Sequence, residues 1–297
     1  MDAVLYAPDN TPGNKTLFSK SVARTLLAKI YAEKPLRDYT KVIQYCDEVK
    51  ADGFDLVDDF SDLFGMNAAG TDAKMRNTKE SILEAQFTSG AGNWCTWMFG
   101  RDLVNWNNNF TWAKWVTPSR DLISAFKQEG DEVRFKESIV YYDCNWSNYY
   151  PSDNYPFMYK CRSANSSIIK YRYADVLLLK AEALIMQDTP DLEGAADIID
   201  KVRDRAKLGA LPTSVRSNKN VLLNALLKER RLELAFEGQR WFDLVRLDKV
   251  EEVMNAVHAK DSGRKAQVYT YDKNSYRLPI PQSVIDANDK IHQNPGY

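Results

Sequence analysis

The sequence predicts a mostly α-helical protein built from tetratricopeptide-like helical hairpins, with an irregular aromatic-rich loop region and small β elements between them. Three observations lead to this fold class. Apolar residues recur at helical spacing over several long segments, small alanines share faces with larger apolar side chains in two helix pairs, and helical periodicity fails between those pairs. With 297 residues and 44% hydrophobic side chains, the chain can bury a core of ordinary size.

The first predicted hairpin follows the N-terminal residues. Apolar residues repeat four positions apart in two adjacent rows over residues 17–31, as on one broad face of a helix. Pro35 ends this helix because it has no amide donor, and Asp38 is the expected N-cap of the next helix. The apolar face of that second helix contains Tyr39, Val42, Ile43, Cys46 and Val49.

The same unit recurs over residues 173–186 and 192–208, where Gly209 is expected to end the second helix. Closely crossing helices in tetratricopeptide-like arrays need small residues at their contacts. Both predicted hairpins supply them, as Ala23, Ala28, Ala174, Ala181 and Ala183.

A third long helix is predicted over residues 220–237, followed by a turn at Gly238 and a helical stretch through Val245. Charged side chains crowd its C-terminal part: Glu229, Arg230, Arg231, Glu233, Glu237, Arg240 and Asp243. Several lie three or four positions apart, so we expect them to pair along the helix. This pattern favours a structural ion-pair network over a functional site.

The chain is expected to divide into three regions. Residues 1–80 form the first hairpin and a following loop, residues 81–165 an irregular aromatic-rich binding region, and residues 166–297 a helical region with a proline-rich terminal strap. Within the middle region, residues 81–87 alternate in polarity like a strand, and only residues 118–128 have helical periodicity.

The strap is the tail from Tyr276 to Tyr297. It contains Pro279, Pro281 and Pro295, which cannot continue a helix and restrict the residues before them. We therefore expect an extended segment laid over the helices.

Composition excludes several classes of function. The net charge of -1 gives no field to attract phosphate backbones, so no nucleic-acid partner is expected. The two histidines, His258 and His292, lie in no metal or triad motif, so neither a catalytic residue nor a metal or cofactor is predicted. No apolar run is long enough to span a membrane, so the chain alone is expected to be soluble. The cysteines lack CxxC spacing and are expected to be free thiols: Cys46, Cys95, Cys144 and Cys161.

An acidic cluster follows Gly53. Its members, Asp55, Asp58, Asp59 and Asp62, alternate with apolar residues. Glycosidases need two facing carboxyl groups, and a calcium loop needs a different spacing. The alternation instead predicts the solvated face of a packed loop.

Aromatic placement is the strongest functional signal. Six of the seven tryptophans fall in the middle region: Trp94, Trp97, Trp106, Trp112, Trp115 and Trp146. A sugar ring has an apolar face that stacks on flat aromatic side chains, and a hydroxyl rim that amides bind. The predicted glycan-binding residues are Trp94, Trp97, Trp106, Asn93, Asn107, Trp146, Asn148, Tyr149 and Tyr150. About half of the tryptophans are expected to fill a core instead, Trp112 and Trp115 first.

Several segments together resemble the C-terminal part of the SusD/RagB family of outer-membrane nutrient-binding lipoproteins. They are Tyr171–Leu184 (YRYADVLLLKAEAL), Lys201–Ala206 (KVRDRA), Glu229–Arg246 (ERRLELAFEGQRWFDLVR), Leu278–Gln282 (LPIPQ) and Gln293–Tyr297 (QNPGY). The resemblance depends on all of them occurring in this order. The matching segments are architectural and include no ligand residues.

The resemblance implies a SusD-like helical scaffold on the outer face of a Gram-negative outer membrane. It also implies oligosaccharide binding without hydrolysis, and association with a SusC-like TonB-dependent transporter. The family's signal peptide, lipidated cysteine and longer N-terminal helical region do not occur in this sequence. Membrane attachment through a lipid anchor is therefore expected only for a longer parent protein.

Two alternatives stay open. A protein- or peptide-binding helical repeat scaffold is favoured if the aromatic segment is buried. A glycoside-active enzyme would need two carboxyl groups about 5 to 10 Å apart in an aromatic cleft.

Overall fold

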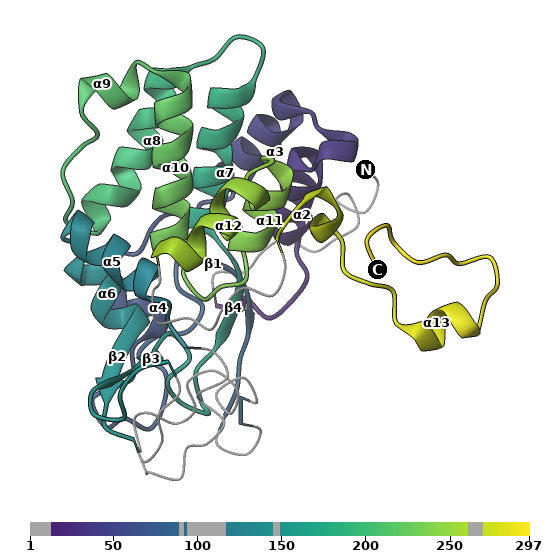
Figure 1. Ribbon diagram of the computed structural model, residues 1–297. Coiled ribbons are helices and arrows are strands. Elements are labelled where there is room, and N and C mark those ends of the chain that lie inside the picture. The colour runs from purple at the N-terminus through teal and green to yellow at the C-terminus, as the bar shows by residue number, and fades with distance from the viewer. Residues whose placement is uncertain (1–12, 89–91, 94–116, 145–148, 261–269) are drawn as a thin grey trace. The chain divides into compact units, whose positions relative to one another are not determined.

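The computed structural model describes residues 13–88, 92–93, 117–144, 149–260 and 270–297 (Figure 1). The chain forms two compact units, Met1–Gln239 and Arg240–Tyr297. The first hairpin packs against the later helices of the first unit in one shared core.

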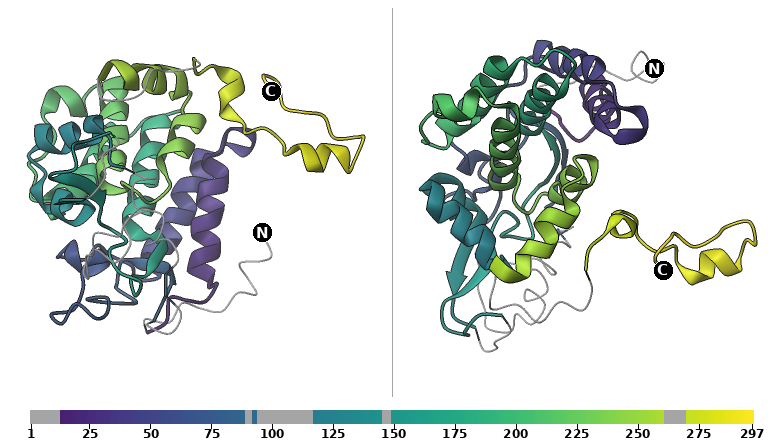
Figure 2. Two further views of the ribbon diagram at one scale, coloured as in Figure 1. Left: turned by 60° about the horizontal axis from the view of Figure 1, so that its bottom comes forward. Right: turned by 45° about the horizontal axis from the view of Figure 1, so that its top comes forward.

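Two helical hairpins and a fifth helix build the first unit, and they stack side by side in both views of Figure 2. These helices are α2 (Lys20–Ala32), α3 (Tyr39–Ala51), α7 (Tyr173–Met186), α8 (Leu192–Arg205) and α10 (Lys219–Glu233). The alanines expected at the helix crossings are all buried. The tetratricopeptide-like arrangement expected from the sequence is thus the arrangement in the structure.

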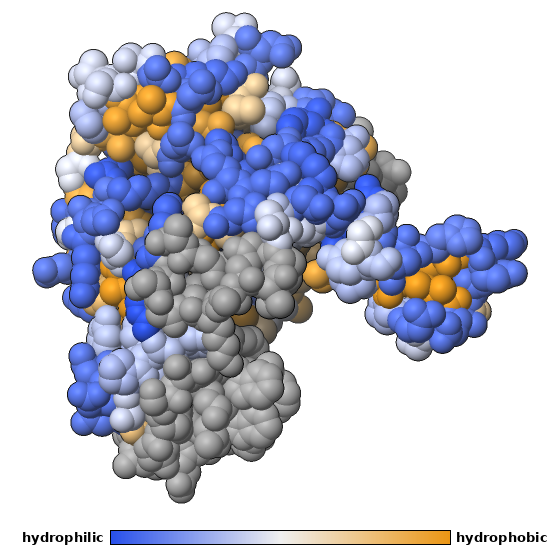
Figure 3. Space-filling model, in the orientation of Figure 1, coloured by the Kyte–Doolittle hydropathy of each residue, from blue (hydrophilic) through white to orange (hydrophobic). Residues whose placement is uncertain are grey.

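Short elements connect and cover these helices. They are η1 (Lys34–Leu36), α4 (Ser61–Phe64), α5 (Arg120–Glu129), α6 (Glu132–Ser138) and α9 (Thr213–Arg216). Figure 3 shows apolar side chains gathered where α8, α9 and α10 meet, at the upper left of the view. Partly buried residues of that area, among them Leu211, Val215 and Leu223, pack on the main core.

Helix ends follow side-chain chemistry closely. The carboxylate of Asp38 accepts a hydrogen bond from the Lys41 amide, which confirms the expected N-cap of α3. The end of α8 was predicted wrongly: it lies at Arg205, and Lys207 takes a left-handed conformation with φ of 62°. Gly209 is therefore not the residue that ends this helix.

Two small antiparallel sheets complete the first unit. Strand β1 (Ser81–Ala85) pairs with β4 (Ile168–Arg172), which confirms the strand expected over residues 81–87. Strand β2 (Ile139–Tyr142) pairs with β3 (Tyr155–Met158) in the region expected to be irregular. The second sheet and α6 were not predicted.

The charged run on α10 forms the expected ion-pair network, but the expected pairing along the helix is wrong there. Glu229 pairs with Arg134 of α6 at 2.5 Å, and Arg230 pairs with Asp175 of α7 at 2.7 Å. These partners lie on other elements, so the network joins α10 to its neighbours. Farther along, Asp243 and Arg246 pair within one helix.

The second unit contains α11 (Arg240–Arg246), α12 (Val250–Lys260), η5 (Lys273–Tyr276) and α13 (Gln282–Asp286). Its tail differs from the extended strap expected from the sequence, because it folds back on itself. The Gln293 side chain pairs with both backbone polar groups of Ile280, at 2.8 and 2.9 Å, and closes a loop around α13. The Tyr297 hydroxyl donates to the Arg277 carbonyl at 3.0 Å. Among the described residues, no helix is long and apolar enough to cross a membrane.

Candidate functional site

The β2–β3 sheet presents a group of tyrosine rings at one end of the first unit, below α5 and α6 in Figure 1. The strands pair with Tyr142 opposite Tyr155 and with Val140 opposite Phe157. Because side chains alternate along a strand, these four lie on one face of the sheet. Together they form one cluster, whereas Ile139 and Tyr141 belong to a different cluster with α5.

Tyr155 is the fully buried centre of this face. The Tyr150 ring meets it edge-on, with ring centroids 5.6 Å apart and an interplanar angle of 76°. Tyr150 is fixed on two further sides. Its hydroxyl donates to the Pro118 carbonyl at 2.8 Å, and the Arg120 guanidinium lies 4.1 Å from its ring centroid.

Several tyrosines around this centre are half-buried, which leaves part of each side chain open to solvent: Tyr142, Tyr149, Tyr150 and Tyr159. The Arg162 guanidinium lies 3.7 Å from the Tyr159 ring centroid. Burial raises the pKa of Tyr142, and the nearby Tyr159 adds to this effect. The Tyr142 hydroxyl therefore stays protonated at neutral pH. The tyrosine face therefore offers flat rings for stacking and hydroxyls that donate and accept hydrogen bonds.

Three described residues flank the tryptophan-bearing segments. Thr117, which follows residues 94–116, shares a 2.9 Å hydrogen bond with the hydroxyl of Tyr155 on β3. Cys144, which precedes residues 145–148, donates its backbone N–H to the Ser152 carbonyl at 2.8 Å, in the connection between β2 and β3. Asn93, which precedes residues 94–116, instead donates its backbone N–H to the Ala164 carbonyl at 2.6 Å, in the turn that follows β3. Thr117 and Cys144 therefore lie beside the β2–β3 sheet, and Asn93 lies at the 163–166 turn.

The structure describes three of the predicted glycan-binding residues. Tyr149 and Tyr150 lie at the tyrosine face, where the Tyr149 carbonyl accepts a hydrogen bond from Arg120. Asn93 is 1% exposed, and its side-chain amide donates to the Ser166 carbonyl at 2.9 Å. In this structure the Asn93 side chain therefore holds the 163–166 turn and does not face solvent.

The remaining predicted residues lie outside the described residues: Trp94, Trp97, Trp106, Asn107, Trp146 and Asn148, as do Trp112 and Trp115. Arg120 and Arg162 were not predicted from the sequence. The Arg120 guanidinium lies over the Tyr150 ring, and the Arg162 guanidinium lies over the Tyr159 ring. An arginine in the first turn of a predicted helix gives no signal of a distant ring partner.

The acidic cluster behaves as the alternating pattern predicted. Asp55, Asp58 and Asp59 pair with Lys201, Lys79 and Lys74, at 2.6, 3.2 and 2.9 Å. The apolar residues between them are buried. A hydrogen bond from Lys74 lowers the pKa of Asp59 to about 2, so this carboxylate is ionised at neutral pH. A general acid needs a raised pKa, and the pKa of Asp59 is lowered.

Metal and disulfide chemistry find no support in the described part of the chain. No group of three or more metal-ligating side chains occurs among the described residues. Cys46 is a buried free thiol, as expected, and Cys95 lies outside the described residues.

Sequence comparison relates the C-terminal half of the chain to known proteins. Residues 153–297 match the model of the SusD family. SusD-like protein P38 of Formosa agariphila is 42% identical over 139 residues, which are 45% of this chain and 25% of that protein. SusD-like protein P2 of the same organism is 34% identical over 142 residues, 46% of this chain and 27% of that protein. The matches span about a quarter of either relative.

Structural comparison extends the similarity to the whole chain. A SusD-like protein from Bacteroides fragilis superposes with a TM-score of 0.74 at 21% identity, covering 99% of this chain and 68% of that one. A laminarin binding SusD-like protein gives a TM-score of 0.71 at 25% identity, covering 100% and 67%. Surface glycan-binding protein A from Bacteroides uniformis gives 0.73 at 20% identity, covering 97% and 64%. The fold is SusD-like.

Proposed function

Because the chain is a member of the SusD/RagB family, we propose that it is a cell-surface glycan-binding protein that captures an oligosaccharide or polysaccharide without hydrolysing it. The tyrosine face of the β2–β3 sheet carries this proposal. Its half-buried rings are held by neighbours before any ligand arrives, so little side-chain freedom is lost on binding.

The chemistry of the face suits a neutral sugar. Stacking on one open ring contributes on the order of 1 to 3 kcal/mol, by analogy with bases on aromatic side chains. Two or three such rings give affinity that is useful but reversible. The tryptophans predicted from the sequence, Trp94, Trp97, Trp106 and Trp146, would add flat surface to the same site. Asn107 and Asn148 would address the hydroxyl rim.

The related proteins support the same class of ligand. One structural neighbour is named a laminarin binding SusD-like protein, and another is named surface glycan-binding protein A. The acidic cluster agrees with non-catalytic binding, because the carboxylates of Asp55, Asp58 and Asp59 form ion pairs with lysines. Catalysis by two facing carboxyl groups has no candidate pair there.

We propose that the protein captures the glycan at the cell surface and also delivers it to a transporter. The family resemblance supports a position on the outer face of a Gram-negative outer membrane, with attachment through a lipid anchor. A SusC-like TonB-dependent transporter is the proposed recipient of the glycan. Release to a transporter requires modest affinity, which a stacking surface provides.

Calorimetric titration of the purified chain against a panel of plant, host and microbial polysaccharides tests the proposal. We expect saturable binding to at least one polysaccharide, with no change in its chain length after prolonged incubation. Absence of binding across the panel would contradict glycan capture, and shortening of the bound polysaccharide would contradict a non-catalytic role.

A further inference from the structure

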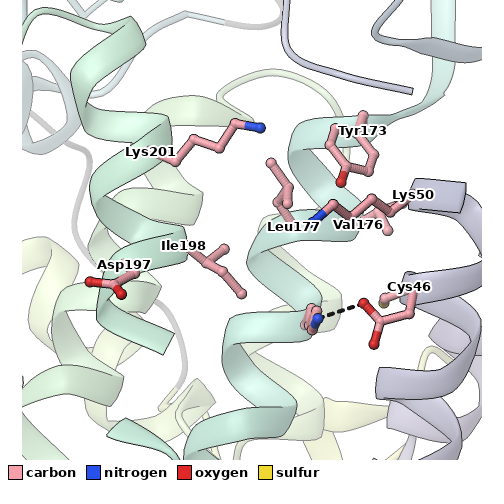
Figure 4. Close-up of a pocket in the computed structure, with 10 residues that line it drawn as sticks. Cys46, Lys50, Tyr173, Val176, Leu177, Asp197, Ile198 and Lys201 are labelled. Atoms are coloured by element: carbon pink, nitrogen blue, oxygen red, sulfur yellow. Dashed lines mark hydrogen bonds and ion pairs between the residues drawn. The ribbon is translucent and has the colours of Figure 1, made fainter. Parts of the chain in front are cut away.

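A cavity of about 170 Å³ lies between α3, α7 and α8, on elements that do not belong to the tyrosine face (Figure 4). Its apolar lining comes from Val176 and Leu177 on α7 and from Ile198 on α8. Polar side chains from the same three helices complete the lining. A cavity of roughly 150 Å³ is known to hold a molecule the size of benzene, so this one has room for a small organic ligand.

Tyr173 is the unusual member of this lining. Its side chain is 1% exposed, and Figure 4 shows its hydroxyl directed into the cavity. Within the described part of the chain this hydroxyl makes no hydrogen bond. A hydroxyl that faces a cavity and has no protein partner among the described residues is open to a hydrogen bond with a molecule in that cavity. Burial raises the pKa of Tyr173 to about 12, and the hydroxyl therefore remains a donor at neutral pH.

The lining holds three lysines, Lys50, Lys180 and Lys201, and two carboxylates, Asp47 and Asp197. Both lining carboxylates are already paired, Asp47 with Lys180 at 2.5 Å and Asp197 with Arg216 at 2.5 Å. Lys50 also lines the cavity, and among the described residues no carboxylate lies within 4 Å of its ammonium group. Lys50 is an exposed cation without a counter-charge among the described residues, and it lines the same cavity as the Tyr173 hydroxyl.

We propose that this cavity binds a small carboxylate with a compact apolar body. The carboxylate accepts hydrogen bonds from the Tyr173 hydroxyl and the Lys50 ammonium group, and the body lies against Val176, Leu177 and Ile198. One uncompensated cation and one neutral donor match a monoanion. An apolar lining of aliphatic side chains matches a ring or short chain better than it matches a sugar.

Ligand-observed NMR titration of the full chain with benzoate tests this site, with benzyl alcohol as the uncharged analogue. We expect saturable benzoate binding in the millimolar range or tighter, and binding of benzyl alcohol weaker by about tenfold. Tyr173→Phe and Lys50→Gln should each weaken benzoate binding by about fivefold or more. Lys219→Gln, which removes an exposed lysine away from the cavity, should leave it unchanged.

Tyr173→Phe removes a hydroxyl with no partner in the folded protein, so its melting temperature should match that of the wild type and keep the comparison valid. Equal benzoate affinity in wild type and Tyr173→Phe would overturn the proposal, as would the absence of saturable binding. A short peptide with a free C-terminal carboxylate is titrated in the same way as a further ligand. If it binds while benzoate does not, the cavity is a peptide site and the proposal is wrong. None of these outcomes depends on glycan binding.

Discussion

The Arg172 guanidinium lies 2.5 Å from the Glu233 carboxylate, and both side chains are shielded from solvent. Arg172 ends β4, whereas Glu233 ends α10, 61 residues farther along the chain. Arg134 lies 3.0 Å from the same carboxylate, and Arg205 also pairs with it. One buried carboxylate therefore joins α6, β4, α8 and α10.

Glu233→Gln should lower the free energy of unfolding by about 3 to 5 kcal/mol, because it leaves buried guanidinium groups without their shared counter-charge. Urea denaturation followed by circular dichroism measures the loss. Asp58→Asn is the matched control, since the Asp58 side chain is 97% exposed in its pair with Lys79. That substitution should change the free energy by less than about 0.5 kcal/mol. Equal effects of the two substitutions would contradict the central place of Glu233.

Acid sensitivity should depend on Asp175. Burial alone would raise the pKa of this carboxyl, but Lys29 and Arg230 outweigh burial and hold the pKa well below 3.8. The unfolded chain therefore binds the proton more readily. The stability that Asp175 contributes is full above pH 3.8 and is lost as the pH falls through the lower, folded-state pKa.

Asp175→Asn tests this dependence. Between pH 5 and pH 2 its free energy of unfolding should fall less steeply than that of the wild type, as measured by urea titration at each pH. Parallel slopes for the two proteins would show that the Lys29–Asp175–Arg230 contacts do not control the acid response.

Asn93 should be structural. Its side-chain amide holds the Ser166 carbonyl, so Asn93→Ala should lower the free energy of unfolding by about 1 to 2 kcal/mol. Differential scanning calorimetry detects this as a lower melting temperature. An unchanged melting temperature combined with lost glycan affinity would instead place Asn93 among the ligand contacts, as the sequence alone indicated.

Helix positions were predictable where a long segment is rich in apolar residues that favour helices, or where an end carries a clear cap. The helix over residues 173–186 has the predicted bounds, and Asp38 caps α3 as expected. Strand β2 was not predictable in this way. Its residues 139–142 are four consecutive apolar or aromatic side chains, because both of its faces pack on neighbours. Such a run has no alternation to reveal it.

The ion-pair partners on α10 could not be predicted from the sequence either. The spacing of charges on α10 fits pairing along the helix, yet Glu229 and Arg230 pair with residues 95 and 55 positions away. A carboxylate pairs with whichever cation the fold brings close, and that choice becomes known only when the helices are packed. For the same reason the sequence identified Tyr150 as a ligand candidate but not its support by Arg120.

Affinity electrophoresis through gels that contain the bound polysaccharide tests the central claim, that aromatic rings around the β2–β3 sheet bind glycan. Tyr149→Ala and Trp146→Ala should each weaken retardation, with dissociation constants raised about fivefold or more and melting temperatures close to the wild type. Phe18→Ala, which removes a ring that is 53% exposed in the segment before α2, should be retarded like the wild type. Retardation of all three variants equal to the wild type would contradict the claim.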